Sequence, residues 1–141
     1  MWLAEGLGLG RVPFAPGTFG TLLGIPLYWL LASWLSWPFY AGLIAVTLPA
    51  SAWICARGAA AYGEPDPSPV VWDEVIGLLV ALIATRPGLW PVVVGFIAFR
   101  AFDILKPFPV GWLERRFSGG WGILLDDVMA GLYALVVVQL A

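Results

Sequence analysis

Long apolar runs, separated by short polar breaks, set the pattern of this chain. Forty-five consecutive uncharged residues lie between Arg11 and Arg57, enough for two membrane-spanning helices of about 20 residues each. A short turn at Trp37 and Pro38 divides this run into segments over 20–36 and 39–56. Because the turn is so short, the two segments must be antiparallel, and the pattern predicts a helical hairpin in a membrane.

Two further apolar segments follow a loop over 57–69, whose prolines and glycine cannot continue a helix. The third segment starts near Val71 and ends before Arg86. At about 1.5 Å per residue it either barely crosses the hydrocarbon or is re-entrant. The fourth covers 89–105 and should end where Pro107 follows, because the residue before a proline is pushed out of the helical region.

The last part of the chain predicts two more helices. Residues 110–118 place apolar side chains on one side and charged ones on the other, which is typical of a short helix lying in the membrane interface. A fifth span runs from about Ile123 to the C-terminus. We therefore predict an all-α, polytopic transmembrane bundle of about four to five spans, forming one domain over 1–141.

Composition agrees with a membrane protein. The chain is 61% hydrophobic and 11% charged, against about 25% charged residues in soluble domains. A net charge of −2 without a long basic run gives no indication of a nucleic-acid partner. Cys55 is the single cysteine, so no disulfide can form within the chain, and we interpret it as a buried apolar residue.

The few charges gather on one side of the predicted bundle. If five spans alternate, the N-terminus, the loop over 57–70 and the segment 106–122 share that side, and only Arg86 among the basic residues lies opposite. The positive-inside rule makes the shared side cytoplasmic. All nine acidic residues fall there too: Glu5, Glu64, Asp66, Asp73, Glu74, Asp103, Glu114, Asp126 and Asp127.

Five carboxylates lie within apolar flanks, where an ionisable residue is costly, by about 2.5–3.5 kcal/mol at a helix centre, and usually marks function. They are Asp73, Glu74, Asp103, Asp126 and Asp127. The two adjacent pairs have a structural alternative, since each could cap or favour a helix N-terminus. Asp103 lies near the end of a span, where the helix dipole disfavours an anion, so it must be paired or liganded.

Arg100, Asp103 and Lys106 are three residues apart and share one stripe of a helix. One interpretation is a structural ion pair between Arg100 and Asp103. The functional interpretation makes Asp103 a metal ligand, while Arg100 and Lys106 bind a phosphate group through a planar fork and a point charge.

The donor types narrow the chemistry. Several carboxylates with no histidine and no usable thiolate form a hard oxygen site, which suits Mg²⁺ or Mn²⁺. The absence of histidine excludes phosphatases with a histidine nucleophile and Ser-His triads, so water activated by a metal is the leading mechanism. Asp126 and Asp127 point about 100° apart on a helix, so one would bind metal and the other orient water or a second ion.

The segment 13–24 adds a weaker signal. Gly17 and Thr18 precede an apolar span, giving a tight turn, a cap from Thr18 and backbone N–H groups suited to an anion. A plain helix start explains the same residues.

Four motifs in order resemble the bacterial phosphatidylglycerophosphatase A family: PGTFGT (16–21), VVWDEVIG (70–77), FRAFDILKPFPV (99–110) and GGWGILLDDVMAG (119–131). The resemblance implies a multi-pass enzyme of the bacterial inner membrane, with its active site facing the cytoplasm. It implies Mg²⁺-dependent hydrolysis of phosphatidylglycerophosphate to phosphatidylglycerol. The acidic positions of the family fall on the five carboxylates above, and its basic positions on Arg100 and Lys106. Where relatives often carry a His-Asp pair, this chain has Glu64, Pro65 and Asp66.

Three alternatives remain at this point: a phosphatase of another lipid phosphate, a cation transporter with an acidic site, and a CDP-alcohol phosphotransferase. The transporter predicts acidic groups near the bilayer midplane, and the phosphotransferase requires a D-G-x-x-A-R motif that the chain lacks.

Overall fold

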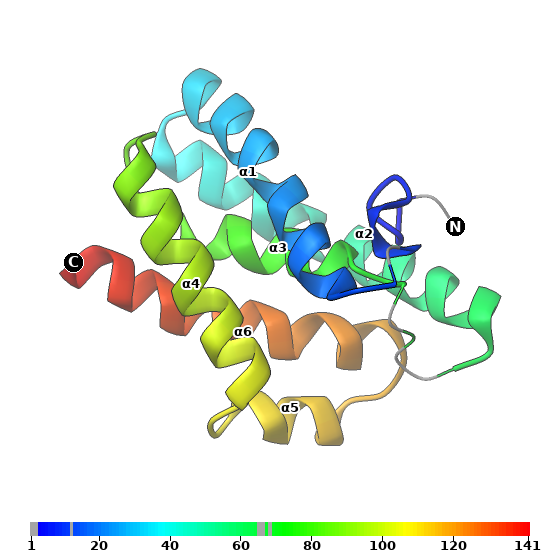
Figure 1. Ribbon diagram of the computed structural model, residues 1–141. Helices are drawn as coiled ribbons and strands as arrows, with labels where there is room; N and C mark the ends of the chain where they lie inside the picture. Colours follow the sequence, from blue (N-terminus) through cyan, green and yellow to red (C-terminus); the bar gives the residue numbers. More distant parts are fainter. Residues whose placement is uncertain (1–2, 12, 65–66, 68) are drawn as a thin grey trace.

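The chain folds as a bundle of helices (Figure 1). The computed structural model describes residues 3–11, 13–64, 67 and 69–141. These residues form a short 3₁₀ helix, η1, and six α-helices without any strand, which confirms the all-α prediction. The elements are η1 (Leu9–Arg11), α1 (Pro16–Trp34), α2 (Trp37–Tyr62), α3 (Trp72–Ala81), α4 (Leu89–Leu105), α5 (Val110–Arg116) and α6 (Gly119–Leu140).

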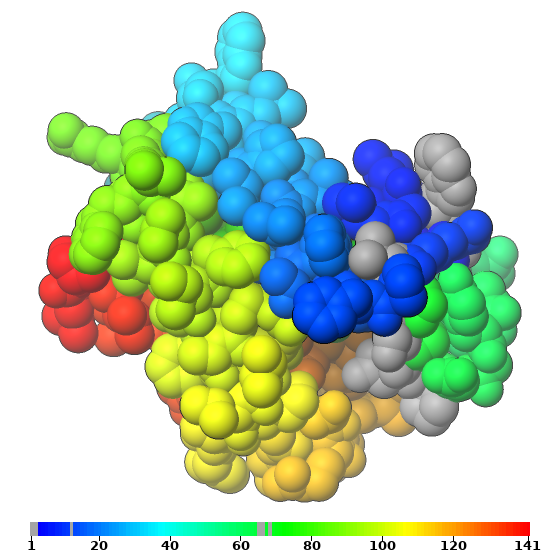
Figure 2. Space-filling view, in the orientation of Figure 1, coloured from blue at the N-terminus to red at the C-terminus, as the bar shows by residue number. Residues whose placement is uncertain are grey.

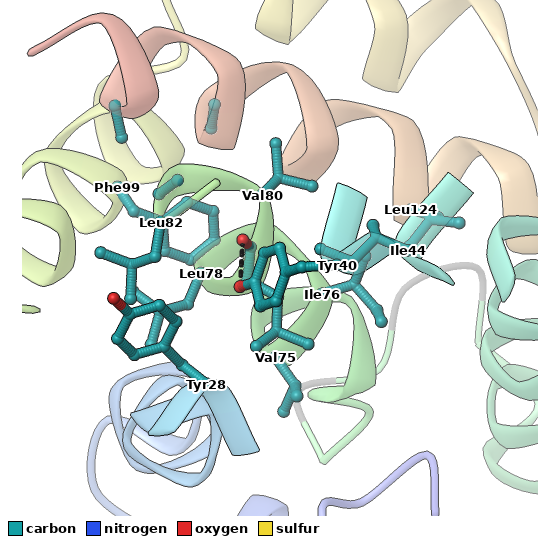
Figure 3. Close-up of a cluster of buried hydrophobic side chains, with 14 of the residues drawn as sticks. Tyr28, Tyr40, Ile44, Val75, Ile76, Leu78, Val80, Leu82, Phe99 and Leu124 are labelled. Atoms are coloured by element: carbon teal, nitrogen blue, oxygen red, sulfur yellow. Dashed lines mark hydrogen bonds between the residues drawn. The ribbon is translucent and has the colours of Figure 1, made fainter. Parts of the chain in front are cut away.

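The short helix α3 lies at the centre of the bundle and contacts α1, α2, α4 and α6 (Figure 1). Eight of its ten residues are buried, as expected for a helix that is apolar on nearly all sides. In the space-filling view, α1 in blue and α4 in yellow-green leave little of α3 visible on this face (Figure 2). Its side chains form the core with residues of the surrounding helices, among them Tyr28, Tyr40, Ile44, Phe99 and Leu124 (Figure 3).

The far end of α3 receives side-chain hydrogen bonds, one from a nearby residue and two from distant parts of the chain. The Tyr40 hydroxyl donates to the Leu79 carbonyl at 2.6 Å (Figure 3), Thr85 Oγ1 donates to Leu82 at 2.6 Å, and Gln139 Nε2 donates to Ile83 at 3.2 Å. These bonds add side-chain partners to carbonyl groups at and just beyond the helix end, where the regular helical bonds stop. At ten residues α3 is about 15 Å long, so the re-entrant interpretation of the third segment fits this helix better than a full span.

Several helix ends differ from the sequence predictions. The turn predicted at Trp37 and Pro38 is the first turn of α2, because proline is well tolerated there. The same helix continues through Arg57, which the prediction placed in a loop, and ends only where Gly63 adopts a φ of 68°. Arg57 lies on the exposed side of α2, so its charge does not interrupt the helix.

Two glycines let α6 pack closely on its neighbours. A Cβ at Gly120 would lie 1.8 Å from the Ala52 carbonyl oxygen, and one at Gly131 would lie 2.5 Å from that of Gly77. No other residue type fits at such distances. The first contact packs Gly120 against α2, so this part of the chain belongs to α6, which starts at Gly119 rather than near Ile123.

The N-terminal residues pack against the start of α3. The Ala4 carbonyl accepts hydrogen bonds from Val71 N at 2.6 Å and Trp72 N at 3.0 Å. The adjacent Glu5 side chain is 1% exposed, and it accepts hydrogen bonds from Arg11 Nε at 2.8 Å and from the Tyr62 hydroxyl. Burial alone would raise the pKa of Glu5, but these two hydrogen bonds and the nearby positive charges together lower it below its ordinary value.

Two of the described helices, α2 and α6, are long and apolar enough to cross a membrane. The prediction of four to five spans is therefore supported for these two helices alone. Asp66, which the prediction grouped with the other acidic residues, lies outside the described residues, as does Pro65.

Candidate active site

Three helices bring five carboxylates together near the start of α1. Asp73 and Glu74 belong to the first turn of α3, Asp103 to the last turn of α4, and Asp126 and Asp127 to α6. Oxygen atoms of Asp73, Glu74 and Asp127 lie within 4.8 Å of one another, and so do those of Asp103, Asp126 and Asp127. Carboxylates far apart in the sequence thus form one continuous cluster.

The cluster is buried and has unused oxygen atoms. Asp73 is 5% exposed, Asp126 is 3% exposed and Asp127 is 1% exposed. Each of these three residues, and Glu74 as well, has a buried oxygen without a hydrogen-bond partner in the part of the chain that the structure describes. Buried polar atoms are almost always satisfied in folded proteins, so these oxygens fit a bound cation, and an all-oxygen donor set fits Mg²⁺ or Mn²⁺.

The helix-capping alternative has different outcomes for the two acidic pairs. Asp126 and Asp127 lie two turns into α6, whose first turn holds no acidic residue, so placing them at a helix start was wrong. The prediction failed because α6 begins earlier than expected. Asp73 and Glu74 do lie in the first turn of α3, but neither makes a side-chain capping bond, since the N-cap residue is Val71.

Two basic side chains border the cluster on the α4 side. Arg100 Nη1 lies 2.5 Å from Asp103 Oδ2, so the predicted ion pair is present. Lys106 Nζ lies 3.0 Å from Asp126 Oδ2 and 3.7 Å from both Asp103 Oδ1 and Glu114 Oε2. Partial burial would lower the pKa of Lys106, but the neighbouring carboxylates, Asp126 first, outweigh it and raise this pKa above its ordinary value. Lys106 therefore carries a full positive charge at neutral pH.

The start of α1 also reaches the cluster. A Cβ at Gly17 would lie 3.0 Å from Glu74 Oε1 and 3.2 Å from Arg100 Nη1, so Gly17 leaves space beside both side chains. Thr18 lies in the first turn of α1, which begins at Pro16 and has no side-chain capping bond. The expectation that Thr18 caps this helix was therefore wrong, because the helix starts two residues earlier.

Sequence reasoning missed two contributors. Glu114 contacts Lys106 from α5, and the Ala4 carbonyl fixes the N–H groups that precede Asp73. Glu5 could have been recognised from the sequence, because it is a charged residue within an otherwise apolar N-terminal stretch.

Comparison with known proteins identifies the family. The family model described as "Phosphatidylglycerophosphatase A" matches residues 2–141. The chain is 38% identical to a phosphatidylglycerophosphatase A of Escherichia coli K12 over 131 residues, covering 92% of this chain and 76% of the relative. It is 37% identical to the protein of the same name from Haemophilus influenzae Rd over 137 residues, covering 96% and 84%.

A third relative carries a different name. A Bacteroides thetaiotaomicron protein, provisionally named phosphatidylinositol-3-phosphatase, is 40% identical over 147 aligned positions, covering 99% of this chain and 91% of the relative. No solved structure matches the chain. The family match along nearly the whole length, together with the two relatives of one name, shows that this chain belongs to the phosphatidylglycerophosphatase A family.

Proposed function

We propose that this chain hydrolyses the phosphomonoester of phosphatidylglycerophosphate to phosphatidylglycerol and phosphate, and that it requires Mg²⁺ or Mn²⁺. One observation carries the proposal: a buried cluster of five carboxylates with unpartnered oxygens lies directly beside two basic side chains. Such a site suits a phosphate group and the cations that accompany it.

The basic residues bind the phosphate in this proposal. Arg100 offers a planar fork of N–H donors and Lys106 a compact charge, and both lie where a phosphate can replace a carboxylate as their partner. Gly17 leaves room beside Arg100, and the positive end of the α1 dipole, where Thr18 lies, favours negative charge nearby.

The carboxylates hold the cation. Asp73, Glu74, Asp103, Asp126 and Asp127 supply only oxygen donors, and the helices fix them before the substrate arrives. When bound, Mg²⁺ would neutralise phosphate charge and activate the attacking water. The chain itself orients the phosphate and excludes bulk water through the burial of α3.

We place the protein in the bacterial inner membrane as a multi-pass enzyme. Large apolar side chains are also exposed on helices other than the two long ones; Leu30 on α1 is 56% exposed and Ile97 on α4 is 62% exposed. A soluble protein rarely exposes large apolar patches, whereas lipid tails would cover such side chains. The acyl chains of the substrate would stay in the lipid, while its phosphate enters the cluster from the cytoplasmic side.

Phosphate release by the purified protein tests this proposal. We expect hydrolysis of phosphatidylglycerophosphate with Mg²⁺, none after chelation, and a loss of about a hundredfold or more in Asp127→Asn. Glu64→Gln is the matched control, because Glu64 is exposed and lies in the loop after α2. Activity that survives chelation, or a fully active Asp127→Asn, would contradict the metal mechanism.

The Bacteroides relative provides a reason to test a second substrate class. Its name concerns a phosphate on an inositol ring, and the cluster contacts the phosphate in our proposal rather than the alcohol that carries it. We expect a substrate panel to rank phosphatidylglycerophosphate above phosphatidate and phosphatidylinositol 3-phosphate. A preference for phosphatidate or phosphatidylinositol 3-phosphate would change the assigned substrate but not the proposed hydrolysis of a phosphomonoester.

A further inference from the structure

We propose that the carboxylate cluster holds two divalent cations that share Asp127, and that the phosphate group admits the second cation by drawing Arg100 and Lys106 off Asp103 and Asp126. The inference rests on the proposed function for the nature of the phosphate ligand. It goes further in assigning the number of ions, the ligands of each, and the order in which they bind.

The geometry divides the cluster into two groups of three. Asp73, Glu74 and Asp127 form one group, here called the inner triad, and Asp103, Asp126 and Asp127 form the other, here called the outer triad. Each triad meets the spacing that one cation requires, and Asp127 belongs to both. Its side chain is 1% exposed and retains an unpartnered oxygen, as a carboxylate between two cations would before they bind.

The two triads differ in their positive neighbours. In the outer triad, Asp103 is paired with Arg100 and Lys106, and Asp126 with Lys106. No residue of the inner triad forms an ion pair with a basic side chain among the described residues, and all three have buried oxygens without partners. The inner triad is therefore ready for a cation, whereas Arg100 and Lys106 compete with any cation for the outer triad.

Charge gives a reason for the second ion. Five carboxylates face two basic side chains, so the ionised cluster has an excess of three negative charges. One divalent cation still leaves an excess of one, and a phosphate dianion would add two more. Two cations bring the cluster close to neutrality with the phosphate bound, which matters because unpaired charge is expensive in a buried site.

The basic side chains can make the exchange. The side chain of Lys106 is 32% exposed and that of Arg100 17% exposed, so both lie at the open edge of the cluster rather than behind it. A phosphate oxygen is at least as good a partner for them as a carboxylate. Once they turn to the phosphate, the oxygens of Asp103 and Asp126 are released to a cation, so phosphate and the second ion should bind cooperatively.

Electron paramagnetic resonance of Mn²⁺ tests the inference without relying on turnover. We expect the purified protein to bind one Mn²⁺ tightly in phosphate-free buffer. Inorganic phosphate should then tighten a second Mn²⁺ by about tenfold or more and produce a spin-coupled spectrum. By reciprocity, saturating Mn²⁺ should tighten inorganic phosphate by the same factor. Protein-free buffer with Mn²⁺ and phosphate gives the background.

Two variants separate the shared ligand from the competing lysine. Asp127→Asn should abolish the coupled spectrum under all conditions. Lys106→Gln should bind its second Mn²⁺ even without phosphate, because the positive charge that competes for the outer triad is gone. Arg86→Gln, exposed and remote from the cluster, is the matched control and should behave as the wild type.

A single Mn²⁺ in the presence of phosphate would overturn the two-ion site. The exchange of partners by Arg100 and Lys106 would be overturned if two Mn²⁺ ions bound with affinities that do not depend on phosphate. An unchanged affinity for the second Mn²⁺ in Lys106→Gln would overturn it as well. Failure of the proposed function is distinct: phosphatidylglycerophosphate would then remain unhydrolysed although the Mn²⁺ titrations follow the expected pattern.

Discussion

Gly17 is the residue at which the start of α1 comes closest to the chemistry. We expect Gly17→Ala to lower kcat/KM for phosphatidylglycerophosphate by up to about tenfold, since its neighbours must shift slightly and a misplacement of about 1 Å at an active site costs about a hundredfold. The added methyl group would press on Glu74 and Arg100, at 3.0 and 3.2 Å. Steady-state kinetics and a melting curve check this together. Gly42→Ala, where no atom lies within 4 Å, controls for the loss of a glycine; an unaffected Gly17→Ala would show that Arg100 needs no such space.

Glu5 stabilises the fold in a pH-dependent way. Its folded-state pKa is lowered from the ordinary 4.5, so its contribution is present above that value and disappears as the pH falls through the folded-state pKa. We expect Glu5→Gln to lower the melting temperature at pH 7, and the difference from the wild type to shrink below about pH 4. Differential scanning calorimetry in detergent checks this, with the exposed Glu64→Gln as control. A constant difference at all pH values would show that the charge of Glu5 is unimportant.

Individual site residues could be predicted from the sequence because a charged residue in apolar surroundings is conspicuous. Asp73, Glu74, Asp103, Asp126 and Asp127 could all be selected that way, and the structure brings them together. The Ala4 carbonyl could not be found, because a backbone group leaves no trace in residue type. The roles of the five carboxylates stay predictions until the variants are measured.

Among the elements, α3 and α6 determine the relative positions of the carboxylates. Gly131 on α6 rests against the backbone of Gly77 on α3, and Asp73 and Asp127 lie on these same two helices. We expect Gly131→Ala to force the helices apart, lowering both cation affinity and activity by about tenfold or more. Mn²⁺ titration and phosphate release check this.

Gly42→Ala is the matched control for the α3–α6 contact, because no atom lies within 4 Å of the added methyl group on α2. Normal cation binding in Gly131→Ala would mean that the two helices can move apart without disturbing the cluster.

Helix existence was predictable from apolar runs, but helix ends were not. The residues 57–62 were predicted as loop from Arg57 and the prolines beyond it, yet a single charge on an exposed helix face is well tolerated and α2 ends only at Gly63. The shortness of α3 was equally hidden, since the hydrogen bonds at its end come in part from Tyr40 and Gln139 in distant parts of the chain. Such long-range hydrogen bonds have no local signature.

For the whole molecule, the membrane orientation is the property most open to direct measurement. Ser36 lies in the exposed connection between α1 and α2, and Ser118 in the exposed connection before α6, near the carboxylate end. With Cys55 replaced by alanine, we expect Ser36→Cys to react with a membrane-impermeant maleimide in intact spheroplasts. Ser118→Cys should react only after permeabilisation. Labelling of Ser118→Cys alone in intact spheroplasts would show that the protein has the opposite orientation. Labelling at both positions would argue against the four- to five-span arrangement.

The central position of α3 has a consequence for biosynthesis. Asp73 and Glu74 leave the ribosome well before α6, so a partly made chain must carry two carboxylates within apolar segments before Asp127 or a shared cation can accompany them. Charged residues in that situation resist burial in lipid, and chains generally settle into their final packing only when all partners are present. The nascent α3 should therefore stay at the membrane surface and enter the bundle last. The active form can then assemble only after α6 has been synthesised.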